Sequence, residues 1–119
     1  MAAPNLKSPT TITGKTATYS VTSSLASVLA NGAGSGKAFR IHAIRAANVD
    51  GAAAYDLDVS HYRSTTHTYL CKTVAVPADS TLVVLSREEI LYLEEGDSLY
   101  AKSDTSSKID LLVTYEEIS

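Results

Sequence analysis

The chain has 119 residues, of which 45% are hydrophobic and 19% charged, so it fits one globular domain and excludes a collagen, a coiled coil or a disordered tail. Its single cysteine, Cys71, excludes an internal disulfide and any site built from several cysteines. The formal net charge of −3 argues against a general nucleic-acid binder. Residues 1–60 carry a net +2 and residues 61–119 a net −5, an imbalance that acidic turns in the second half explain better than packing between copies.

Residues 1–10 predict an extended arm, ahead of a single folded domain at residues 11–119. Pro4 and Pro9 fix their own backbone and bias the residue before each of them away from helix. An arm of this kind frays or lies on a neighbouring molecule. The segment lacks the positive patch and apolar run of a signal peptide, and no stretch reaches the roughly 18 apolar residues of a membrane-spanning helix. We therefore expect a soluble, reducing compartment and no membrane partner.

From residue 11 onward the pattern predicts short strands separated by turns. Residues 23–30 carry apolar side chains at a helical spacing, but we favour a strand, or a short turn leading into one. Residues 31–37 are glycine-rich and predict a loop. The alternation shifts near Ala43 and Ile44, which indicates a β-bulge. The predicted strands are residues 16–22, 38–49, 53–63, 67–76, 81–85, 90–93, 98–103 and 108–115.

Short strands with turn signals about every 8 to 12 residues are typical of an antiparallel sandwich or barrel. We predict an all-β fold, an antiparallel β-sandwich of the jelly-roll type with about eight strands. In the last strand Ile109, Leu111 and Val113 share one face, while Leu112 interrupts the polar face and is predicted to meet a partner. With the arm, the candidate partner-interface residues are Pro4, Asn5, Leu6, Lys7, Pro9 and Leu112.

No group of residues predicts a catalytic, metal or cofactor site. Residues 31–37 look like a phosphate-binding loop, but they lack its first glycine and no hydroxyl residue follows Lys37. His61 and His67 flank a hairpin turn, where solvated side chains are the preferred interpretation over a weak metal site. His67 and Cys71 are four residues apart in one strand, about 13 Å, too far for a thiol–imidazole pair. We predict a protein that is not an enzyme and binds no cofactor or small-molecule substrate.

Seven tyrosines are spread over most of the predicted strands. Tyr62 and Tyr100 alternate away from their core-facing neighbours and are predicted to be the exposed ones. Exposed tyrosines suit a platform for a sugar. In a domain without tryptophan, however, tyrosines at the rim with the ring inward and the hydroxyl outward are the preferred interpretation.

Five stretches carry a resemblance that extends over nearly the full chain. They are residues 5–17 (NLKSPTTITGKTA), 46–51 (AANVDG), 76–84 (VPADSTLVV), 93–99 (LEEGDSL) and 113–119 (VTYEEIS). Together they resemble small structural proteins encoded by tailed phages, notably cyanophages of marine and freshwater cyanobacteria. The GDSL turn and strand recur in many β-sandwich virion proteins, so this piece points to architecture more than to role.

The resemblance implies a non-enzymatic virion structural protein. Its first implication is a head decoration or cement protein on the outer capsid surface, made in the host cytoplasm, with the major capsid protein as partner and a trimer or dimer as the homo-oligomer. The alternatives are a neck, tail or fibre component and a carbohydrate-binding module for host attachment. The resemblance supplies no residue-level motif, so it assigns no binding residue.

Overall fold

Strands account for all the regular secondary structure of residues 7–119, the part of the chain that the computed structural model describes. None of these residues forms a helix long and apolar enough to cross a membrane. The strands are β1 (Ile12–Ser20), β2 (Ala26–Ala30), β3 (Ala38–Asn48), β4 (Tyr55–Arg63), β5 (Thr66–Val76), β6 (Thr81–Leu85), β7 (Leu91–Leu93), β8 (Ser98–Ser103) and β9 (Ile109–Ile118).

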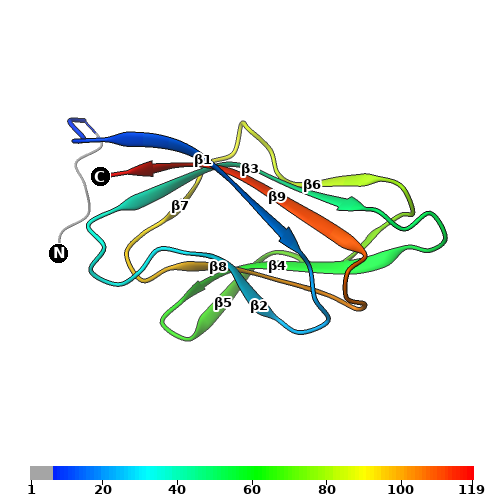
Figure 1. Ribbon diagram of the computed structural model, residues 1–119. Coiled ribbons are helices and arrows are strands. Elements are labelled where there is room, and N and C mark those ends of the chain that lie inside the picture. The colour runs from blue at the N-terminus through cyan, green and yellow to red at the C-terminus, as the bar shows by residue number, and fades with distance from the viewer. Residues whose placement is uncertain (1–6) are drawn as a thin grey trace.

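Two antiparallel sheets lie face to face as the two layers of a sandwich (Figure 1). The five-stranded sheet has the order β1-β9-β3-β6, and β7 follows β6 along the same edge of β3. The four-stranded sheet has the order β2-β8-β4-β5. The predicted antiparallel β-sandwich is therefore confirmed. Its jelly-roll type stays a prediction, which this strand order supports.

The core is formed by the inward face of each sheet, as the alternation of the strands requires. In β9, Leu111 and Val113 are fully buried, and they belong to the same core cluster as Leu57, Val59 and Leu99 of the opposite sheet. Burying an aliphatic side chain of this size contributes about 1.5–3 kcal/mol to stability. The sandwich is thus held together by its interior, and its two outer faces are left for other roles.

The strand boundaries differ from the sequence prediction mainly at the chain ends. β1 begins at Ile12 and β9 continues to Ile118 because these two residues pair with each other. Residues 23–30 do contain a strand, β2. The bulge expected near Ala43 is present as register shifts on either side of it, against β9 and β6. The predicted loop at residues 64–66 is shorter, since only Ser64 and Thr65 form the turn, both with the positive φ that a tight hairpin requires.

The predicted arm is described only in part. Pro4, Asn5 and Leu6 lie outside the described residues. Lys7 is exposed and Pro9 half-buried, in a stretch without strand structure. The backbone joins the five-stranded sheet at Thr10, whose N–H donates to the carbonyl oxygen of Ser119 at 2.6 Å. The domain boundary and the contacts of the arm stay predictions.

Candidate functional site

The outer face of the five-stranded sheet carries an apolar side chain at its centre. Leu112 lies in β9 between Thr18 of β1 and Arg45 of β3, which are its paired neighbours. Its side chain is half-buried and points outward, because Leu111 and Val113 point into the core. Arg45 in turn pairs with Val83 of β6, which is 55% exposed. Thr18, Leu112, Arg45 and Val83 therefore form one row across four strands.

A groove of about 610 Å³ lies along this row and is mainly apolar. Leu112 and Ala47 contribute its apolar lining, and Arg45 and Asp110 place one cation and one anion beside it. Thr18 and Ser20 line it from the edge strand β1. We call Leu112, Val83 and the residues of the groove the groove face. The prediction that Leu112 faces outward thus agrees with the geometry, whereas the groove could not be foreseen from one strand.

The outer face of the four-stranded sheet holds a cluster of rings, Tyr62, His67, Tyr69 and Tyr100, which we call the aromatic face. The ring of Tyr62 lies 4.9 Å from that of Tyr100 and 4.6 Å from that of His67, between ring centres. Tyr62 and Tyr100 are only half-exposed because they pack on each other, while Tyr69 is 40% exposed. This arrangement joins residues from β4, β5 and β8, of which the sequence prediction grouped only Tyr62 and Tyr100.

The two histidines beside the hairpin turn lie on opposite faces of the sheet and do not meet. Nδ1 of His67 is 2.9 Å from the hydroxyl of Ser60 on the outer face. Nε2 of His61 is 3.1 Å from Oδ2 of Asp97 at the end of the sandwich. Among the described residues, no three His, Cys, Asp or Glu side chains gather as they would around a metal ion.

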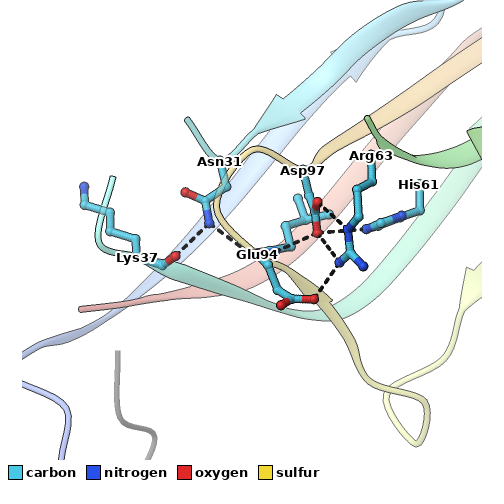
Figure 2. A network of polar contacts seen from close by, with 7 residues as sticks. Asn31, Lys37, His61, Arg63, Glu94 and Asp97 are labelled. Atoms are coloured by element: carbon cyan, nitrogen blue, oxygen red, sulfur yellow. Dashed lines mark hydrogen bonds and ion pairs between the residues drawn. The ribbon is translucent and has the colours of Figure 1, made fainter. Parts of the chain in front are cut away.

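Asp97 is the centre of a polar network that closes one end of the sandwich (Figure 2). It ends the turn between β7 and β8, where Gly96 adopts a positive φ, and its side chain is 2% exposed. Arg63 donates to both carboxylate oxygens, at 2.8 and 2.6 Å, and the backbone N–H of Glu94 donates at 2.9 Å. Burial raises the pKa of this carboxyl, but the hydrogen bonds from Arg63 and Glu94 outweigh burial, so the pKa lies below its usual range.

The sequence did not predict this network. Arg63 and Asp97 are 34 residues apart, and only the pairing of β4 with β8 brings Arg63 to the turn that holds Asp97. Nothing in the network is arranged for a substrate, since Asp97 is saturated by donors from the protein. We therefore regard it as structural.

Cys71 is half-buried in β5, and its thiol faces the carbonyl oxygen of Leu57 at 3.7 Å. Burial raises the pKa of this thiol. A raised pKa lowers the thiolate fraction, and His67 is engaged with Ser60 on the outer face. The geometry therefore offers no activated nucleophile at Cys71.

Neither a protein-family model nor a curated protein matches this sequence. Among solved structures, a protein of Bacillus endospore appendages, described as a novel family of disulfide-linked pili, is similar with a TM-score of 0.53 and 11% identity, over 92% of this chain and 87% of that one. A pentameric capsid protein from metagenomic phage sequences gives a TM-score of 0.42 and 16% identity, over 84% of this chain and 59% of that one. The similarity to the appendage protein shows the shared fold.

Proposed function

We propose that this chain is a non-enzymatic structural protein of a tailed-phage virion that decorates the capsid by binding the outer surface of the major capsid protein shell. The sequence resemblance supports the assignment to a virion, and a β-sandwich with a packed core suits a structural component. The groove face is the single observation that carries the docking proposal. Leu112 points outward at the centre of the sheet, and Val83 is exposed in the same row. Solubility alone would favour polar side chains at these positions, so the apolar surface indicates a contact with a partner.

The groove face fits a weak contact that is repeated many times. It combines an apolar centre with one cation, Arg45, and one anion, Asp110, which together fix orientation on a polar shell. A contact of this size needs no high affinity, because many copies on one shell act together through multivalency. The arm at residues 1–10 is proposed to extend the contact, since ten extended residues span up to about 35 Å.

Leu112→Lys tests the docking surface. We expect the variant to bind shells that lack the protein at least tenfold more weakly, because burying a leucine contributes about 1.5–3 kcal/mol and 1.4 kcal/mol is a factor of ten. Co-sedimentation with the shells measures this change. Val49→Lys is the control, since Val49 is an apolar residue at the surface, 56% exposed, and lies outside the groove face. Equal binding by both variants, with the fold intact by circular dichroism, would remove the groove face from the proposal.

The particle itself distinguishes decoration from a neck, tail or fibre role. The stain ratio of this protein to the major capsid band in purified particles is high for a decoration protein and low for a tail part. Particles that lack the protein should lose their DNA on heating or low-salt shock before complete particles do. If incomplete particles are equally stable, the decoration role is wrong even where Leu112→Lys weakens binding.

The aromatic face favours a second candidate function, carbohydrate binding during host attachment. Its tyrosine rings come from three strands and lie beside hydrogen-bonding groups, among them Lys72, whose Nζ is 4.9 Å from the ring centre of Tyr69. Ring faces with a few polar neighbours are the usual components of a sugar site. We expect Tyr62→Ala and Tyr100→Ala each to lower the signal on a glycan array at least tenfold. Tyr92→Ala on the other sheet is the control, and an array without any signal for the unaltered protein ends this candidate.

A further inference from the structure

Only one edge of the two sheets is both long and regular in the described part of the chain. β6 and β7 have five and three residues, and five-residue β2 has a register shift against β8. β5 is long, but its register against β4 shifts twice and Thr73 has a φ of 52°. β1 runs for nine residues in unbroken register with β9. Proteins usually blunt their sheet edges by shortness, bulges, proline or charge. β1 is long, has no bulge and no proline, and its one charged side chain, Lys15, is paired with Glu117.

The backbone groups on the open side of β1 can be assigned from the hydrogen bonds at its ends. Thr11 and Ser119 exchange both their N–H···O bonds, and the N–H of Val21 donates to Ile109 at 2.9 Å. In an antiparallel ladder the backbone N–H and C=O groups of successive residues point to opposite sides of the strand. The backbone groups of the odd-numbered residues of β1 therefore point to β9. The backbone groups of the even-numbered residues point away from β9, and no described strand pairs with that side of β1. These outward residues are Ile12, Gly14, Thr16, Thr18 and Ser20, all exposed.

We propose that β1 pairs with β1 of a second copy of this chain, antiparallel, about a two-fold axis at Thr16. Thr16 then faces Thr16 of the second copy, and Gly14 faces Thr18. All the outward N–H and C=O groups find partners, about ten hydrogen bonds in total. The two five-stranded sheets become one continuous sheet.

The side chains of β1 suit this self-pairing. Threonine opposite threonine is a favourable cross-strand pair. The only charged side chain, Lys15, lies opposite Ala17 of the second copy, and Glu117 neutralises it at 2.9 Å, so no unpaired like charges meet. Because Thr18 and Ser20 line the groove from β1, the pairing also places the two groove faces on the same side of the continuous sheet. The pairing does not depend on the virion proposal.

Thr16→Pro removes one outward N–H and leaves the bonds from β1 to β9 in place, so it should convert a dimer to a monomer without loss of the fold. Thr16→Ala keeps the N–H and should remain a dimer. Analytical ultracentrifugation measures both. Three results would overturn the pairing: an unaltered protein that stays monomeric up to about 1 mM, a Thr16→Pro variant that is still a dimer, or a Thr16→Ala variant that dissociates as Thr16→Pro does.

Cysteine scanning in a Cys71→Ser background fixes the register and does not depend on the proline variant folding. A directly opposed pair has Cα atoms about 5.5 Å apart, within disulfide range, so Thr16→Cys should cross-link on mild oxidation. Thr18→Cys is the matched control, because its two copies would be about 14 Å apart. No cross-link at Thr16, or equally fast cross-linking at Thr18, would contradict the two-fold axis at Thr16.

Discussion

Asp97→Ala is expected to lower the free energy of unfolding by about 3 kcal/mol, a large share of the 5–15 kcal/mol typical of a domain. The substitution leaves the N–H of Glu94 and the imidazole of His61 without their acceptor. It also removes the buried partner of Arg63. The side chain of Arg63 is 51% exposed, so its charge can be rehydrated, which keeps the loss at the low end for a broken buried ion pair. Urea titration followed by circular dichroism measures the change.

Two companion variants make this prediction specific. Asp97→Asn keeps the shape and one acceptor oxygen, so its loss should be about half as large. Glu88→Ala removes an equal charge from an exposed turn and should change stability by less than about 0.5 kcal/mol. If Asp97→Ala costs no more than Glu88→Ala, the network in Figure 2 does not stabilise the fold.

Two carboxyl groups, Asp97 and Glu117, predict how stability depends on pH. Asp97 has a pKa below its usual range, and so does Glu117, which accepts hydrogen bonds from Lys37 and Lys15. A carboxyl whose pKa is lower in the folded state stabilises the fold while ionised. Its contribution is complete above its unfolded pKa of about 4 and is lost as the pH falls through the folded value. The unaltered protein should therefore be equally stable from pH 7 to about 5 and weaken below pH 4, and Asp97→Ala should show a shallower fall.

The sequence predicted the elements of this fold better than their contacts. Alternation in residues 108–115 identified the inward face of β9, because a period of two is local information. Ser60 shows the opposite case. Alternation with Val59 places its side chain on the outer face of β4, yet it is completely buried, and its hydroxyl is bonded to His67. The burial depends on Tyr69 of the adjacent strand β5 and on Tyr100 of β8, and β8 is distant in sequence. For the same reason the sequence predicted only one residue of the groove face, Leu112, because the other strands of that face are distant in sequence.

Two buried asparagines were also beyond sequence reasoning, and they join the two sheets at opposite ends of the sandwich. Asn48 ends β3, and its Nδ2 donates to the carbonyls of Ala53 and Val76, each at 2.9 Å. Asn31 follows β2, and its Nδ2 donates to the carbonyls of Lys37 and Leu93, at 2.8 and 2.9 Å. In a sequence both residues look like ordinary turn formers. In the fold each amide donates to two carbonyl groups, through one buried and one part-buried hydrogen bond, and connects one sheet to the other.

Asn48→Asp should therefore cost about 3–5 kcal/mol at pH 7 although the two side chains have the same shape. The amide donates two hydrogen bonds, whereas a carboxylate donates none and places a negative charge against the carbonyls of Ala53 and Val76. A proton on the new carboxyl group restores one donor and removes the charge. The deficit should shrink as the pH falls from 7 to 4.5, because burial raises the pKa of such a group in the folded state.

Asn31→Asp is the internal replicate, because the same two-carbonyl arrangement occurs at the other end of the sandwich, and it should show the same loss and the same pH trend. Thr105→Asp adds one negative charge to an exposed turn and controls for net charge. Urea titrations of all three variants at both pH values separate the explanations. A deficit that is equal at pH 7 and 4.5 would mean that packing, and not the two donated hydrogen bonds, makes Asn48 necessary. A deficit that shrinks with falling pH in both asparagine variants, and is absent in Thr105→Asp, would assign the joining of the two sheets to these two amides.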